Sequence, residues 1–188
     1  MRKLLKFTFL PFGFIFIFIF FVYLVLPILA FPYPPPDAVQ SVEPGDLETP
    51  LRRGYFTNFT REEVLIHYQK QFKRSTILSI PLPTYRLNYP PEEAQILIRD
   101  QTQSTFLEEI VHPFRESIFI NGFEPTDPQY DVWYKGVDFR QKIVVKFIPS
   151  SIFMRLLVSL GSIIAIYILT KEWLKVGKDL LKTVRKRR

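Results

Sequence analysis

An uncharged run of 25 residues, 7–31, constrains this chain more than any other feature of its sequence. At about 1.5 Å per residue, a helix of that length crosses the roughly 30 Å hydrocarbon core of a bilayer. A single apolar segment in lipid must be helical, because only a helix satisfies its own backbone groups. A second apolar run, 156–169, lies near the other end. We therefore predict two transmembrane helices, 7–31 and 150–173, with the residues between them on one side of a membrane.

The charge distribution gives the orientation of these two segments. Residues 32–150 carry 13 basic and 16 acidic side chains, whereas the whole chain carries 25 and 18. The positive surplus therefore lies in and beside the apolar segments. The positive-inside rule then places residues 1–6 and 174–188 in the cytoplasm and 32–150 outside the plasma membrane. This distribution is typical of a membrane protein and argues against nucleic-acid binding.

A cleaved signal peptide ending at Ala30 is the alternative for the first segment. Its apolar core is longer than the usual stretch of about 7–15 residues, and Ile28 is bulky where a small residue is expected. We predict an uncleaved signal anchor. After it, six prolines between 32 and 50 predict an extended stalk, since polyproline II needs no internal hydrogen bonds.

Residues 51–149 predict a small two-layer α+β domain outside the membrane. Thr60 and Glu63 have the spacing of a capping box, and apolar residues at helical spacing follow them, so we predict a helix over 61–73. A short edge strand is predicted at 76–82, bounded by prolines. A second helix is predicted to begin at Pro91, and a helix could restart over 106–111.

The remaining pattern predicts a mostly antiparallel sheet covered by helices on one face. We expect a strand over 117–120, ended by the turn pair Asn121-Gly122. A hairpin is expected to join 130–135 to 139–148 through a loop that contains Gly136. In its second strand apolar and basic residues alternate, which is typical of a sheet with one face in water.

No residue pattern predicts a catalytic, cofactor or metal site. The absence of cysteine excludes disulfides and thiolate chemistry. Glu109 and His112 have the spacing of half a di-iron carboxylate site, but that architecture requires a second copy. We expect His112 at the surface or at a helix cap instead. We therefore predict no cofactor and no enzymatic activity.

Three sets of residues are candidates for contacts with partners. Aromatic residues gather on the predicted hairpin, and we expect the face that they leave exposed to contact a protein: Tyr130, Trp133 and Tyr134. Two small residues four apart in the second span, Gly161 and Ala165, could form a helix-packing seam for self-association or another protein. Basic residues on one side of an amphipathic tail are expected to contact anionic inner-leaflet lipid: Lys175, Lys178, Lys182 and Arg185.

Our first hypothesis is a two-pass envelope protein whose outer domain is an interaction, assembly or scaffolding module. The layout of span, domain and span resembles that of bacterial polysaccharide co-polymerases of the chain-length-determinant type. Their proline-rich motif at the second span is represented here by Pro149 alone. That resemblance implies the second hypothesis, a homo-oligomeric co-polymerase or channel. The third is a membrane-tethered ectoenzyme.

Overall fold

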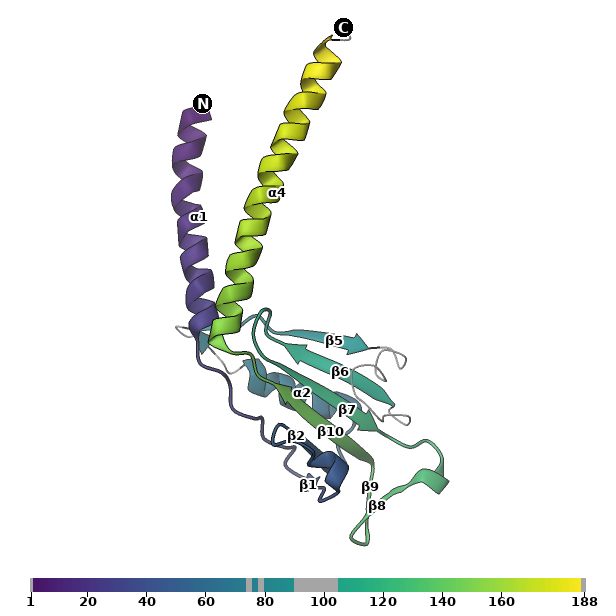
Figure 1. Cartoon of the computed structure of the whole chain (residues 1–188). Coiled ribbons are helices and arrows are strands. Elements are labelled where there is room, and N and C mark those ends of the chain that lie inside the picture. The colour runs from purple at the N-terminus through teal and green to yellow at the C-terminus, as the bar shows by residue number, and fades with distance from the viewer. Residues whose placement is uncertain (1, 74–75, 78–79, 90–104, 187–188) are drawn as a thin grey trace. The chain divides into compact units, whose positions relative to one another are not determined.

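The computed structural model describes residues 2–73, 76–77, 80–89 and 105–186. The chain divides into two compact units, one formed by Met1–Leu26 with Ser151–Arg188 and the other by Pro27–Ser150. The first unit is helical, and the second contains the sheet (Figure 1). The described residues confirm the predicted α+β class, with three helices and an antiparallel sheet of six strands.

The helical unit consists of α1 (Arg2–Val25) and α4 (Ile152–Lys186). Within α4, Ile152–Leu180 is, by length and composition alone, the one described helix long and apolar enough to cross a membrane. The described apolar stretch of α1, Phe12–Val25, is shorter. α1 ends before residue 31 because Pro27 disfavours a helical conformation at the residue before it.

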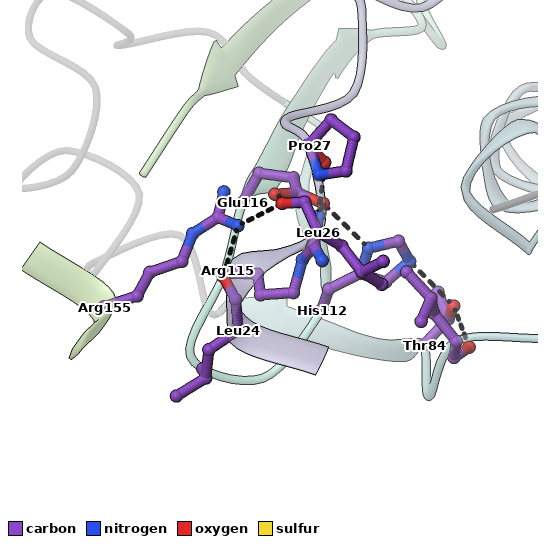
Figure 2. A network of polar contacts seen from close by, with 9 residues as sticks. Leu24, Leu26, Pro27, Thr84, His112, Arg115, Glu116 and Arg155 are labelled. Atoms are coloured by element: carbon purple, nitrogen blue, oxygen red, sulfur yellow. Dashed lines mark hydrogen bonds and ion pairs between the residues drawn. The ribbon is translucent and has the colours of Figure 1, made fainter. Parts of the chain in front are cut away.

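A buried arginine joins the two helices of this unit. Arg155 is 2% exposed and donates from Nη1 to the carbonyl oxygens of Leu24 and Leu26, at 3.2 and 3.1 Å (Figure 2). The last carbonyl groups of a helix lack partners within it and carry partial negative charge. The guanidinium group therefore caps the C-terminal end of α1.

Six strands form the main sheet of the second unit in the order β1-β2-β10-β7-β6-β5. Their bounds are β1 (Val39–Gln40), β2 (Arg52–Thr57), β10 (Gln141–Ile148), β7 (Ser117–Phe123), β6 (Phe106–Val111) and β5 (Tyr85–Tyr89). Two small ladders pair β3 (Thr76–Ile77) with β4 (Ile80–Pro81) and β8 (Val132–Tyr134) with β9 (Val137–Phe139). Two short 3-10 helices are η1 (Pro44–Asp46) and η2 (Pro128–Tyr130).

The helix α2 (Arg61–Lys73) lies across one face of the main sheet (Figure 1). Its start confirms the predicted capping box: the Thr60 backbone N–H donates to Glu63 Oε2 at 2.8 Å, and the Glu63 N–H donates to Thr60 Oγ1 at 3.3 Å. Its buried side chains pack with sheet residues in one core: Val64, Leu65, Tyr68 and Phe72 with Ile110, Ile118, Ile120, Ile143, Val145 and Phe147.

The possible helix over 106–111 is wrong, because this segment is the strand β6. Alternate residues Phe106 and Ile110 face α2, and Glu108 lies between them at 0% exposure. The alternation is not evident in the sequence because Glu108 and Glu109 are adjacent. Glu108 can occupy the core-facing side because the guanidinium groups of Arg61 and Arg86 neutralise it there.

The predicted turn at Asn121-Gly122 is also wrong, because β7 continues through both residues to Phe123. Gly122 pairs with Phe106 on one side and Ile143 on the other. A Cβ atom at Gly122 would lie 2.1 Å from the Phe106 ring. The glycine therefore provides space for an aromatic ring that covers the backbone.

Three further predictions differ from the structure or cannot be compared with it. Where we predicted one edge strand over 76–82, the described residues Thr76–Ile77 and Ile80–Pro81 pair as the short β3–β4 ladder. The last strand, β10, pairs with β2 and β7, whereas the predicted hairpin partner contributes to a separate ladder. The helix predicted to begin at Pro91 lies outside the described residues.

The proline-containing segment after Pro27 contacts the domain, although we expected a stalk that stands away from it. Leu29, Phe31 and Ala38 pack against the core cluster. The Tyr33 backbone makes two hydrogen bonds with the Gln71 side chain of α2. The Tyr33 N–H donates to Gln71 Oε1 at 2.8 Å, and Gln71 Nε2 donates to the Tyr33 carbonyl oxygen at 2.9 Å. β1 then joins the sheet beside β2.

Candidate functional site

The β8–β9 hairpin extends from the end of the sheet at which β10 begins (Figure 1). Lys135 and Gly136 connect its strands with φ angles of 52° and 80°. Two successive positive φ angles are typical of a type I′ turn, whose twist matches that of the strands it joins. The turn is therefore two residues long, and Asp138 belongs to β9 instead of to the predicted loop.

One face of this hairpin packs on the domain. Val132 and Phe139 are 9% and 7% exposed and form a small apolar cluster with Phe56 of β2. The Tyr134 ring stacks on Phe56 with 4.2 Å between centroids and 16° between planes. Lys135 Nζ lies 5.2 Å from the centre of the Tyr134 ring. These contacts hold the hairpin against the sheet by its inner face.

The opposite face carries the exposed tryptophan. Trp133 is 64% exposed and pairs in register with Asp138, so both side chains project from the outer face. Tyr130 is 53% exposed, but it ends η2 and is not part of the hairpin strands. Of the three predicted contact residues, the structure therefore exposes Trp133 and Tyr130 and uses Tyr134 for packing.

Asp138 lies opposite this tryptophan across the ladder, and Asp131 and Asp127 precede it along the chain. None of the three has an ion-pair partner among the described residues. The nearby cations have other contacts. Arg140 donates to Glu124 at 2.6 Å, and Lys135 lies over the Tyr134 ring. Asp127 caps η2 by accepting the Gln129 N–H at 3.1 Å. The carboxylate directly beside Trp133, that of Asp138, is therefore not neutralised by a described cation, and the sequence analysis did not identify this pair.

Both chain connections leave the α+β unit at the end opposite the hairpin. Arg115, in the β6–β7 turn, donates to the carbonyl oxygen of Pro27 at 2.8 Å. Ile148, the last residue of β10, pairs with Ser117, just after the same turn. β10 has eight residues and at about 3.3 Å per residue separates that end from the hairpin by roughly 25 Å.

The residues with metal-like spacing do not form a common site. Glu109 accepts a hydrogen bond from the Tyr89 hydroxyl, while His112 is fully buried, with Nδ1 3.2 Å from Glu116 and Nε2 3.1 Å from the Thr84 hydroxyl (Figure 2). Among the described residues there is no group of three or more side chains suited to holding a metal ion. His112 was expected at the surface or at a helix cap, and that expectation is wrong.

Sequence reasoning also missed two polar clusters. Glu108 accepts from Arg61 and, at 2.8 Å, from Arg86 Nε; this hydrogen bond raises the pKa of Arg86. On the other face of the sheet, Lys142 bonds to Glu43 at 2.6 Å and Asp46 at 2.8 Å. Burial opposes protonation of Lys142, but the two carboxylates outweigh it and raise its pKa. Because each cluster joins opposite charges from different elements, both act as ties between elements.

A small pocket of about 250 Å³ lies between the segment after α1 and the end of α2, lined by Leu29, Ala30, Phe31, Pro32, Tyr33, Gln71 and Phe72. No carboxylate lines it, and His112 does not contribute to it.

The candidate residues of α4 are exposed. No neighbouring atom would lie within 4 Å of a Cβ atom at Gly161, and Ala165 is also exposed. Among the α4 side chains that the structure describes, Arg155 and Ser159 are buried. Lys175 bonds to Glu172 at 2.6 Å, and Lys178 is exposed. For Lys182 and Arg185 the structure describes the helical backbone alone. α4 runs without a break to Lys186, so the predicted tail continues the helix.

Comparison of the chain with models of protein families, with curated proteins and with solved structures gave no match.

Proposed function

We propose that this chain is a two-pass membrane protein whose α+β domain is an interaction module outside the membrane. The observation that carries the proposal is that the two ends of the domain differ. Both chain connections leave the domain at one end, and the exposed Trp133 projects from the hairpin at the other. A domain between two spans needs its connections at one end, because both helices enter the same bilayer face. The hairpin then lies at the end of the domain opposite both connections.

The helical unit supports the two spans in this proposal. Ile152–Leu180 has the length and composition of a span, and the apolar part of α1 supplies a shorter one. In this topology the two termini are cytoplasmic, and the basic residues near the end of the second span meet anionic headgroups: Lys175, Lys178, Lys182 and Arg185. The plasma membrane is the proposed location.

A scaffolding or assembly role fits this geometry better than turnover of a substrate. Two connections restrain the orientation of a domain more than one does, and the packed inner face restrains the hairpin. An exposed tryptophan on a restrained element is typical of the anchor of a protein interface. We propose that Trp133 and Tyr130 form that contact.

The topology can be tested with single cysteines, since the chain contains none. Tyr130→Cys and Lys178→Cys, in separate full-length variants, would be treated on intact cells with a membrane-impermeant maleimide. We expect labelling at position 130 alone, and at both positions after the membrane is opened. Labelling at position 178 in sealed cells would refute the orientation.

The interaction can be tested by placing a photo-crosslinking amino acid at position 133 in the full-length protein in native membranes. Tyr85 of β5 is 57% exposed and is the matched control position. We expect a discrete protein adduct from position 133 and none from position 85. No adduct from either Trp133 or Tyr130 would contradict the proposed function.

The second candidate function is a homo-oligomer of the co-polymerase or channel kind. The exposure of Gly161 and Ala165 favours it, because small residues on a free helix face allow a second helix to approach closely. Disulfide crosslinking of Ala165→Cys in native membranes distinguishes the two: a ladder of homomultimers supports the oligomer. An absence of homomultimers removes this candidate.

A further inference from the structure

We propose that the partner of the hairpin is a protein surface with an exposed arginine or lysine, whose cation lies against the Trp133 ring and pairs with the Asp138 carboxylate. This inference rests on the proposed function and specifies the chemistry of the partner. It follows from the pairing of the two residues, the charge around them and the way the hairpin is held.

The first step is the position of the two side chains. Trp133 and Asp138 are direct cross-strand partners, and the Cβ atoms of such pairs lie about 4.5–5.5 Å apart on one face. An aromatic ring and a carboxylate side by side form the two walls of a site for a cation: the ring face attracts positive charge, and the carboxylate neutralises it. Both residues are exposed, so the site is accessible.

The second step is that no described cation occupies this site. Lys135 lies over the Tyr134 ring on the inner face, and Arg140 pairs with Glu124. Asp138 and Asp131 have no ion-pair partner among the described residues. The ring and the carboxylate are therefore available to a cation from another molecule.

The third step is the rigidity of the support. The stack of Tyr134 on Phe56 and the burial of Val132 and Phe139 hold the inner face, and the two-residue turn fixes the pairing. A backbone segment that is already held in place loses little conformational freedom on binding. Trp133 is therefore presented in a form suited to an interface anchor.

The same charges disfavour other occupants. The headgroups of anionic lipids and the carboxylates of an acidic protein would be repelled by Asp138 and by Asp131, two residues before Trp133. A wholly apolar partner would bury Asp138 beside Trp133 without compensation, which is unfavourable for a charged group. A basic protein surface is the one occupant that satisfies both residues.

The test uses the full-length protein in native membranes, with the photo-crosslinker at Tyr130 so that Trp133 and Asp138 can be varied. Asp138→Asn, Asp138→Lys and Trp133→Leu are compared with Glu48→Gln, which removes a carboxylate that is 69% exposed on another part of the domain. Asp138→Asn should lower the adduct yield about 3- to 10-fold, and Asp138→Lys should lower it further. Trp133→Leu should lower it at least about 10-fold, and Glu48→Gln should leave it unchanged. Raising the salt concentration should lower the yield of the wild type more than that of Asp138→Asn.

Several results would overturn this inference and leave the proposed function intact. An adduct that Trp133→Leu abolishes, but that neither Asp138 variant nor salt affects, would indicate an apolar partner. A higher yield with Asp138→Lys would indicate an acidic partner, and an adduct with lipid would indicate the membrane surface. Failure of the wild type to form any adduct from position 130 or 133 would instead contradict the function itself. Thermal unfolding of each variant, with wild-type behaviour expected at these exposed positions, separates loss of binding from loss of fold.

Discussion

Replacement of Gly122 with alanine tests whether the close approach of the Phe106 ring determines the residue at this position. A Cβ atom at Gly122 would lie 2.1 Å from Phe106 Cε1 and 2.2 Å from Cζ. Ordinary contact begins at 3.4 Å, so the ring must move by about 1.3 Å. It is 6% exposed and lies under the Arg61 guanidinium group, whose carbon is 5.0 Å from the ring centre. The ring therefore cannot move without disturbing its neighbours.

Overpacking of a filled core costs about 1–3 kcal/mol, and loss of a glycine from a strand returns roughly 0.5–1 kcal/mol. We therefore expect Gly122→Ala to lower the free energy of unfolding by about 1–2 kcal/mol. Phe106→Leu removes the ring atoms that would clash and should itself cost about 1 kcal/mol. In that background Gly122→Ala should be close to neutral, so the two substitutions should be coupled by at least about 1 kcal/mol.

The measurement is urea denaturation of the full-length variants in detergent micelles, with the folded fraction at each urea concentration determined by pulse proteolysis. Gly45→Ala is the control, because nothing lies within 4 Å of a Cβ atom at that position. We expect it to change the free energy of unfolding by less than about 0.5 kcal/mol. If Gly122→Ala were neutral in the wild type, or if its cost were unchanged by Phe106→Leu, the steric explanation would be wrong.

Three further predictions concern buried or titrating groups. In urea denaturation, Glu108→Gln should lower the free energy of unfolding by about 2–3 kcal/mol, because it leaves two guanidinium groups without their shared carboxylate. The control Glu62→Gln, at the exposed edge of the same cluster, should lower it by less than about 0.5 kcal/mol. Tyr68→Phe should stabilise the fold by about 1 kcal/mol, since the buried hydroxyl has no hydrogen-bond partner among the described residues. Burial raises the pKa of Tyr68, so the wild type should lose stability as the pH rises above about 10 and the variant should lose less. Hydrogen bonds from the Thr60 backbone and hydroxyl lower the pKa of Glu63 below 4.5. The ionised Glu63 therefore stabilises the fold above that pH, and this stabilisation is lost as the pH falls through the pKa of the folded state. Glu63→Gln should accordingly show a smaller loss of stability than the wild type in an acid titration.

Local signals determined which parts of the fold could be predicted. The helix α2 has the predicted bounds because its start is set by residues three apart, Thr60 and Glu63, that bond to each other. β6 could not be recognised in the same way. Its buried Glu108 depends on Arg61, 47 residues away, and on Arg86, 22 residues away. A carboxylate looks unsuited to a core position until these distant partners are known.

The hairpin illustrates the same limit at the candidate site. Trp133 and Tyr134 lie on opposite faces because side chains alternate along a strand, a geometry that adjacent residues alone determine. The sequence prediction placed Asp138 in the loop before a strand that begins at residue 139, whereas the turn consists of Lys135 and Gly136. This shift changes which residue stands opposite Trp133, and the tryptophan–aspartate pair could be identified only from the register.

The strand β10 sets the position of this pair relative to the chain connections. It is hydrogen-bonded to β2 on one side and β7 on the other, so its register is held from both edges. Ile143 and Val145 on its inner face pack against α2, while Lys142 on the outer face ties it to Glu43 and Asp46. Removal of one residue from β10 would exchange these faces, since side chains alternate. Removal of two would preserve the faces and bring the hairpin about 7 Å closer to the end where the chain leaves the domain. The distance at which Trp133 is presented is thus a property of one strand, and it can be altered without altering the hairpin itself.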